Sequence, residues 1–164
     1  MPVQAQKHIT MKTGRPLLCW DIFMEGFHKR LELAADILQL GRLSEQQGWQ
    51  HDFNFEWQMV WLNQTIVVTD PELNIVYASS NMLAMNGYLP EEVIGRRPSM
   101  FQGQDTSPET KCHIRNAIEQ RIPFETSILN YRKNGETYMC QLHEYPMFNH
   151  KKALVNFIAF ETLI

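Results

Sequence analysis

The chain has little of what marks secreted, membrane-spanning or disulfide-rich proteins. It contains no run of about 18 apolar residues, so no spanning helix is expected. The first residues, Met-Pro-Val-Gln-Ala-Gln-Lys, lack the apolar core of a signal peptide. Only three cysteines occur, Cys19, Cys112 and Cys140, and they lie far apart. An odd number of separated cysteines without a signal peptide predicts reduced thiols in a cytoplasmic protein.

Positive charge is also scarce. The 15 Lys and Arg residues are outnumbered by 18 Asp and Glu residues, giving a net charge of −3. This balance argues against a nucleic-acid surface, which is normally basic. The six histidines show no metal-ligand spacing, so no metal site is expected. With 164 residues, 44% apolar and 20% charged, the composition predicts one globular domain and a modest extension.

The first part of the chain is predicted to be helical after a mobile tail at residues 1–16. From Trp20 to Leu40 apolar residues recur at spacings of three and four, and Gly41 is placed to cap the helix. A second helix is predicted over 44–62. Its aromatic and apolar side chains need a partner surface, and they are Trp49, Phe53, Trp57, Val60 and Trp61.

Two partners for these helices stay open. The first helix can dock on the core of its own chain, or it can pair with a second copy of the protein. Its apolar stripe covers fewer than three heptads, which is too short to establish a coiled coil.

After residue 64 the apolar period becomes that of strands. Thr65–Thr69 is β-branched, and Asn134-Gly135 predicts a type I′ hairpin turn. The predicted elements are strands at 65–69 and 75–79, a short helix from the N-cap Ser80 to Gly87, a single-turn helix at 90–94, a helix capped by Ser107 and ending before Pro123, and strands at 124–132, 136–147 and 153–162. This order predicts an α+β fold, a five-stranded antiparallel sheet with helices on one face.

Residues 94–103 read Ile-Gly-Arg-Arg-Pro-Ser-Met-Phe-Gln-Gly. The stretch resembles the Gly-Arg-Asn-Cys-Arg-Phe-Leu-Gln-Gly signature of light-oxygen-voltage (LOV) domains, the flavin-binding branch of the PAS family. Six more segments, in the correct order, resemble the same domains over about residues 64–162: 68–71, 75–79, 86–88, 91–95, 114–118 and 130–135. The resemblance implies a PAS fold over 63–164, preceded by an N-terminal helical extension over 1–62 that serves dimerisation or covers the sheet.

The resemblance also assigns site residues, position by position. Where the photoreceptors keep the cysteine that adds to flavin, this chain has Pro98, so the cysteinyl-flavin adduct is not expected. One phosphate-binding arginine is replaced by Ser99, and the other is matched by Arg115. Two ring-binding amides are replaced, by Cys140 and Glu161, whereas the positions of Asn130 and Gln102 are kept. Since flavin affinity depends on such groups, no cofactor is expected, with FMN as the alternative.

Strand periodicity places a second carboxylate with these residues. Cys140 and Glu144 share one face of their strand, as do Phe157 and Glu161 of the next. A turn pairing Phe148 with Ala153 would set Cys140 opposite Glu161, and Glu144 opposite Phe157. We therefore expect a polar cavity holding Cys140, Glu144, Glu161 and Asn130, and suited to a cationic or hydrogen-bond-donating molecule. The alternative is a cavity filled by large side chains, with both carboxylates reaching solvent at the strand ends.

The opposite sheet face is too apolar to meet water. It is formed by Leu129, Tyr131, Met139, His143, Tyr145, Ile158 and Phe160. This predicts a homodimer through the N-terminal helices and the outer sheet face.

Catalysis is not expected. Cys140 and His143 are the nearest approach to a nucleophile and a base, but a separation of three puts them on opposite faces of the strand. The carboxylate pair of Glu144 and Glu161 is the other candidate, and no nucleophile elbow or phosphate loop accompanies it. We expect a bacterial sensory or interaction module, whose signal leaves through the N-terminal helices or an unknown signalling partner protein.

Overall fold

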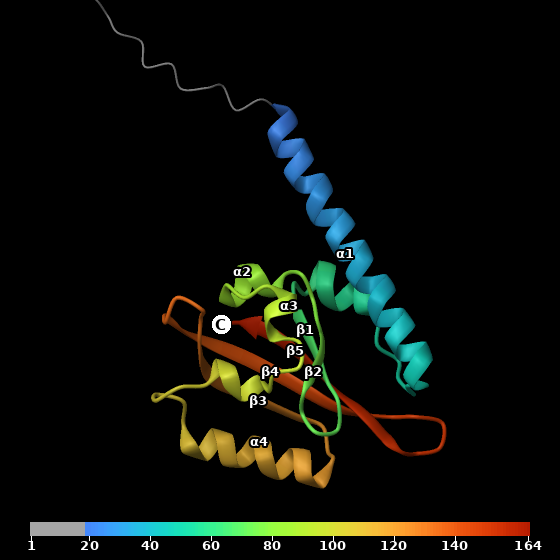
Figure 1. The fold of residues 1–164 in the computed structure, drawn as a ribbon, viewed down its shortest axis with the longest axis vertical. Coiled ribbons are helices and arrows are strands. Elements are labelled where there is room, and N and C mark those ends of the chain that lie inside the picture. The colour runs from blue at the N-terminus through green and yellow to red at the C-terminus, as the bar shows by residue number, and fades with distance from the viewer. Residues whose placement is uncertain (1–18) are drawn as a thin grey trace, which may run out of the picture.

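The computed structural model describes residues 19–164, so the predicted tail at 1–16 and the side chain of Trp20 lie outside the described part. Five strands form one antiparallel sheet in the order β2-β1-β5-β4-β3 (Figure 1). The predicted α+β architecture is therefore confirmed. The strands are β1 (Thr65–Thr69), β2 (Ile75–Ala78), β3 (Phe124–Tyr131), β4 (Thr137–Phe148) and β5 (Leu154–Leu163).

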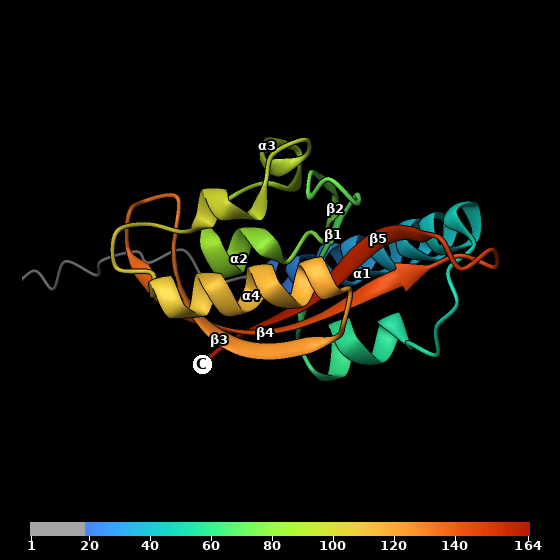
Figure 2. The ribbon, with the colours of Figure 1, turned by 90° about the horizontal axis from the view of Figure 1, so that it is seen from below.

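Short helices and one longer helix lie on one face of this sheet. Figure 2 shows α2 (Met82–Asn86), α3 (Pro90–Val93) and α4 (Pro108–Gln120) on the same side. A 3₁₀ turn, η2 (Pro98–Phe101), links α3 to the loop before α4. The Ser107 hydroxyl accepts a hydrogen bond from the Thr110 amide, as predicted for the α4 N-cap. We call this covered side the inner face.

The N-terminal helix is longer than predicted, and the second helix predicted at 44–62 is wrong. α1 (Cys19–Gln47) passes through Gly41, which therefore caps nothing. The helix ends instead at Gly48, whose φ of 67° suits a residue without a Cβ. Trp49 then pairs with Asn149 as an isolated β-bridge. Only the short π-helix η1 (Trp57–Trp61) comes after it and before β1.

Two turn predictions also need correction. Ser80 does not cap α2, because its hydroxyl donates to Asp36 at 2.7 Å, and Asn81 is the N-cap position. The Asn134-Gly135 turn is not type I′, which needs positive φ at both residues; Gly135 alone has it. Asn134 Oδ1 accepts the Glu136 amide at 3.0 Å, which favours a three-residue loop with glycine in the left-handed region.

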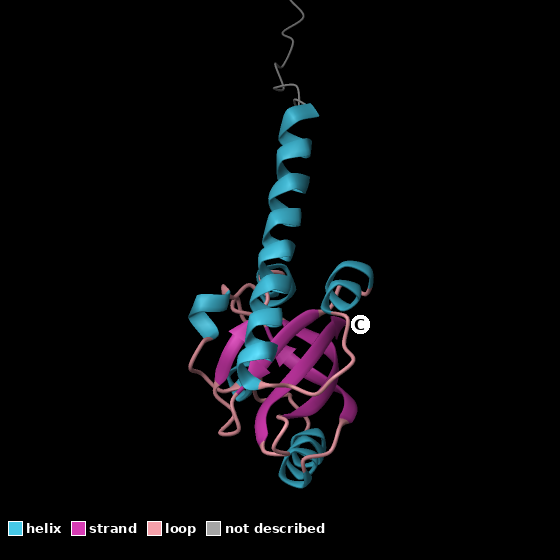
Figure 3. Ribbon diagram, turned by 90° about the vertical axis from the view of Figure 1, so that its right-hand side faces the viewer, coloured by secondary structure: helices cyan, strands magenta, loops and turns pink. Residues whose placement is uncertain are grey.

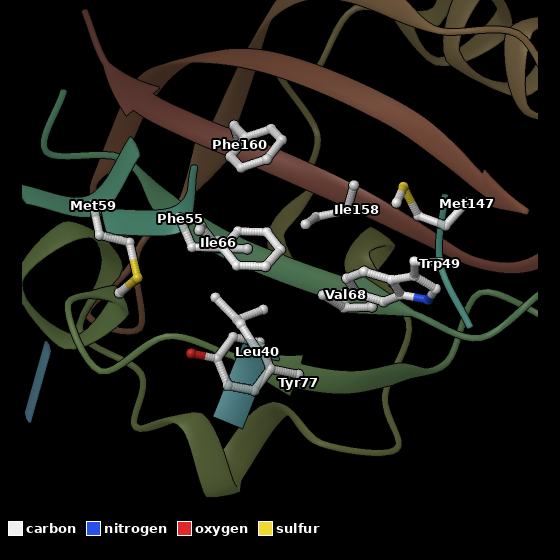
Figure 4. Close-up of a cluster of buried hydrophobic side chains, with 10 residues drawn as sticks. All are labelled: Leu40, Trp49, Phe55, Met59, Ile66, Val68, Tyr77, Met147, Ile158 and Phe160. Atoms are coloured by element: carbon white, nitrogen blue, oxygen red, sulfur yellow. The ribbon is translucent and has the colours of Figure 1, made fainter. Parts of the chain in front are cut away.

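The C-terminal half of α1 docks on the core of its own chain, which is one of the two partners that the sequence left open for this helix. Asp36 and Leu40 are buried, and the Asp36 carboxylate accepts the Tyr77 hydroxyl at 2.8 Å and the Ser80 amide at 2.9 Å. Figure 4 shows the apolar cluster that α1, residues 49–61 and the outer sheet face share: Leu40, Trp49, Phe55, Met59, Ile66, Val68, Tyr77, Met147, Ile158 and Phe160.

The N-terminal half of α1 extends away from the sheet (Figures 1 and 3). Leu31 is 52% exposed there, and Leu38, also on the solvent side, is 62% exposed. The helix therefore combines a docked part with a part that has exposed apolar side chains.

Candidate functional site

A cavity of about 440 Å³ lies between the inner sheet face and the wall made by η2 and α4. Residues of β1, β3, β4 and β5 form its floor. This volume is within the range of small-molecule sites, which is about 300–1,000 Å³.

The cavity brings together all six candidate residues from the sequence. They come from four elements and one loop: Gln102 after η2, Arg115 from α4, Asn130 from β3, Cys140 and Glu144 from β4, and Glu161 from β5. Pro98 and Ser99 also line it.

The predicted pairing of β4 with β5 is wrong by two residues. Cys140 pairs with Leu163, Leu142 with Glu161, and Glu144 with Ala159. The shift arises beside the hairpin, where the register is irregular between Met147 and Phe148. Because side chains alternate with a period of two, the shift leaves the predicted face unchanged, and both carboxylates still line the cavity.

The two carboxyl groups of the floor are in a poorly solvated environment. Glu161 is 6% exposed, so it does not reach solvent at the strand end. Burial raises its pKa to about 7, although a hydrogen bond from Cys140 acts in the opposite direction. Glu144 is half-buried and borders the cavity; burial, then the charge of Glu161, raises its pKa to about 8. Burial therefore disfavours the ionised form of both carboxyl groups.

Cys140 is a protonated thiol in this setting. Its Sγ donates to Glu161 Oε2 over 3.8 Å, and burial followed by the Glu161 charge raises the thiol pKa. Since the thiolate is the nucleophile, a raised pKa leaves Cys140 unreactive. Of the cysteines with described side chains, Cys112 is exposed and outside the cavity lining.

Buried polar atoms of the floor lack partners. No hydrogen bond within the described chain reaches Asn130 Oδ1 or Thr69 Oγ1, and both residues line the cavity. Buried polar groups are normally satisfied, so these atoms mark where a ligand or water would be held.

The mouth of the cavity carries the opposite charge. Arg97, just before η2, and Lys111 and Arg115 of α4 line it, together with the acidic Glu119 of α4. None of the three basic side chains makes a salt bridge within the described residues. These three cations do not contribute to the pKa of Glu144 or Glu161. The basic mouth and the acidic floor are therefore separate electrostatic environments.

The sequence prediction missed three cavity residues. Lys111 precedes Arg115 by four positions, so helical spacing alone could have placed both on one face of α4. Arg97 is exposed and lines the mouth, but an arginine in a loop carries no signal of its own for a cavity. Thr69 carried no signal, because a threonine in a β-branched strand is ordinary.

The outer face is partly covered. Phe53 packs edge-on against Tyr145 and Phe160, with ring centroids 5.0 Å apart in both pairs. Over β3 and β4, Met139 remains 38% exposed. His143 lies 3.7 Å from Glu125, on the face opposite Cys140, so the two cannot act as nucleophile and base.

The order of strands, the helices on the inner face and the cavity beneath α4 define a PAS-type module. The PAS domain family model matches residues 63–162, and the chain belongs to this family. Among the described residues, no cluster of side chains suits a metal ion, and no helix has the length and apolarity needed to span a bilayer.

The relatives include plant and bacterial photoreceptors. The chain is 38% identical over 107 residues to Protein TWIN LOV 1 of Arabidopsis thaliana, covering 63% of this chain and 27% of that protein. It is 35% identical over 97 residues to a blue-light-activated histidine kinase of Brucella ovis, covering 57% of this chain and 20% of that protein. The chain thus spans about a quarter or less of the curated relatives it matches.

Solved LOV domains share the fold. One, studied with a flavin analogue, superposes with a TM-score of 0.63 at 29% identity, covering 69% of this chain and 86% of that one. The dark structure of Aureochrome1 LOV superposes with a TM-score of 0.63 at 29% identity, covering 70% of this chain and 86% of that one. The likeness supports a sensory role in signal transduction.

Only part of the cavity fits a flavin. Arg115 at the mouth suits a phosphate, and Asn130 Oδ1 is an unpartnered acceptor for a ring N–H. A flavin ring edge, however, also presents carbonyl oxygens, which need donors. Glu144 and Glu161 offer acceptor oxygens when ionised, and the Cys140 thiol is already directed at Glu161. When ionised, these two carboxyl groups do not supply the donors that the ring carbonyls need.

Proposed function

We propose that this chain is a sensory PAS module of signal transduction that binds a small molecule in the cavity and forms no cysteinyl-flavin adduct. The open, polar cavity of about 440 Å³ carries the proposal. A domain with a purely structural role would fill such a space, because unfilled interiors lose dispersion contacts and leave polar groups unpaired.

The absence of the adduct rests on the position of the thiols. Pro98 stands where the resemblance puts the reactive cysteine, and it has no nucleophile. Cys140 borders the cavity from β4, but its raised pKa keeps it protonated. We infer that light-driven thiol addition is not the signal in this chain, and we assign it no catalytic role.

A cavity-filling substitution tests ligand binding. Ala159 lines the cavity, so Ala159→Phe should occlude it. Native mass spectrometry of the wild-type protein should show an added mass that heating releases, and the variant should lack it. Ala153→Phe, at an exposed position in the β4–β5 turn, is the matched control and should retain the added mass. Equal occupancy in all three proteins would contradict binding in this cavity.

A flavin sensor without an adduct is the second candidate. It is favoured by the LOV relatives and by the presence of Arg115, Asn130 and Gln102 in the cavity. FMN in the released fraction, at one equivalent per chain, would select this candidate over the first.

We also propose that residues 63–164 are the PAS module and that residues 1–62 serve sheet covering and homodimerisation. Leu31 and Leu38 on α1, Trp61 on η1 and Met139 on the outer sheet face are exposed apolar side chains that a second copy would bury. Gel filtration with light scattering should give a dimer, and Leu31→Glu should shift it to the monomer. A monomer at micromolar wild-type concentrations would remove this proposal.

A further inference from the structure

The cavity has a strong asymmetry of charge between its floor and its mouth. The floor holds two carboxyl groups, Glu144 and Glu161, and no basic side chain contributes to that floor among the described residues. The mouth holds three basic side chains, Arg97, Lys111 and Arg115, and one acidic side chain, Glu119, so its net charge is positive. Neither set neutralises the other, because no salt bridge joins them within the described part of the chain.

Hydrogen-bonding capacity on the floor is biased toward acceptors. Asn130 and Thr69 are each 6% exposed, and Asn130 Oδ1 and Thr69 Oγ1 have no partner within the described chain. The Thr69 hydroxyl can also donate, and the Cys140 thiol is a weak donor that is directed at Glu161. A molecule that presents several N–H groups to this floor would satisfy atoms that are otherwise unpaired.

We propose, resting on the proposed function, that the cavity binds a compact dipolar molecule whose ammonium or similar N–H-rich cation lies between Glu144 and Glu161. Its anionic group, a phosphate or a carboxylate, lies at the mouth among Arg97, Lys111 and Arg115. Burying a charge is costly unless it is paired, and this arrangement pairs both ends of the ligand and both sets of side chains.

Three small probes separate the two ends of such a ligand. Pyridoxamine 5′-phosphate has an ammonium and a phosphate. Pyridoxine 5′-phosphate has a hydroxyl in place of the ammonium, with nearly the same shape. Pyridoxamine keeps the ammonium and lacks the phosphate. Isothermal titration calorimetry with the full chain gives a Kd for each probe.

The expected result is that pyridoxamine 5′-phosphate binds about tenfold or more tightly than either partial probe, which is the scale of one charge-assisted contact at each end. In the variants Glu144→Gln and Glu161→Gln, pyridoxamine 5′-phosphate should bind only about twofold more tightly, or less, than pyridoxine 5′-phosphate. Arg115→Gln should instead reduce the difference in Kd between pyridoxamine 5′-phosphate and pyridoxamine. Glu125→Gln, on the outer sheet face, removes the same charge and should leave all three affinities unchanged.

Equal affinity for the ammonium and hydroxyl probes would overturn the proposal, as would an ammonium preference that survives both glutamine variants. Failure of all three probes to bind would overturn it too. A released ligand without a cationic group, such as FMN, would end this inference and leave the proposed sensory function intact. The absence of any released ligand, with no difference between the wild type and Ala159→Phe, would instead count against the proposed function itself.

Discussion

Glu161→Gln should remove a pH-dependent loss of stability from the folded protein. The substitution keeps the shape of the side chain and abolishes its ionisation. Burial raises the Glu161 pKa from 4.5 to about 7 in the folded state, whereas the unfolded chain keeps an ordinary value. Between these two values the folded state binds more protons than the unfolded state, so the free energy of unfolding falls as pH rises. A pKa difference of this size corresponds to about 3 kcal/mol.

The assay is urea unfolding of the wild type and the variant at about pH 4 and about pH 8, which bracket the two pKa values. The wild type should lose up to about 3 kcal/mol more than the variant over this interval. The variant also lowers the pKa of Glu144, because the Glu161 charge is one cause of that shift, so both effects have the same sign. His51, whose pKa burial lowers, acts oppositely but equally in both proteins.

Glu125→Gln is the control, since its carboxylate is exposed on the other face of the sheet. It should show the wild-type dependence on pH. Parallel profiles for the wild type and Glu161→Gln would refute the reasoning, because they would show that the Glu161 carboxyl is solvated when ionised.

Two further substitutions test how the fold supports the site. Asp36→Ala removes the acceptor that holds the Tyr77 hydroxyl and should lower the free energy of unfolding by about 2–4 kcal/mol. Asp52→Ala, at an exposed position, is the control and should change it by less than about 0.5 kcal/mol. Urea midpoints measure both, and equal effects would contradict a stabilising contact between Asp36 and Tyr77. Gly103→Ala places a Cβ 2.3 Å from the Tyr131 ring and should cost about 1–3 kcal/mol by overpacking; an unchanged thermal midpoint would contradict that close contact.

The sequence predicted the second half of the chain well because the signals there are local. β-branched runs, the Ser107 cap with Pro108, and apolar alternation in 136–147 each depend on neighbouring residues, and each element formed close to its predicted bounds. The side of the sheet on which Cys140, Glu144 and Glu161 lie could also be predicted, because side chains alternate between the two faces along a strand.

The first half could not be predicted in the same way. Trp49 and Phe53 have helical spacing, yet tertiary contacts determine their conformation: the Trp49 indole donates to Asn156 Oδ1 at 2.8 Å, and Phe53 packs on Tyr145. Gly41 could not be distinguished from Gly48 as a helix end, because tertiary contacts of the neighbouring residues decide between them. The hairpin register was missed for a related reason: the turn pairs Phe148 with Leu154 and not with Ala153, and an irregularity between Met147 and Phe148 shifts the pairing by one more residue.

The central claim, a ligand-binding PAS module without thiol–flavin chemistry, is tested most directly by the absorption spectrum of the purified protein before and after blue light. Mass spectrometry then identifies the molecule that heating releases. The account predicts no flavin band and no light-induced change, together with a released small molecule that carries both an amine-type cation and an anionic group. A flavin band that bleaches under blue light and recovers in the dark would contradict it. Such a result would mean that the cavity holds a flavin whose chemistry light changes reversibly.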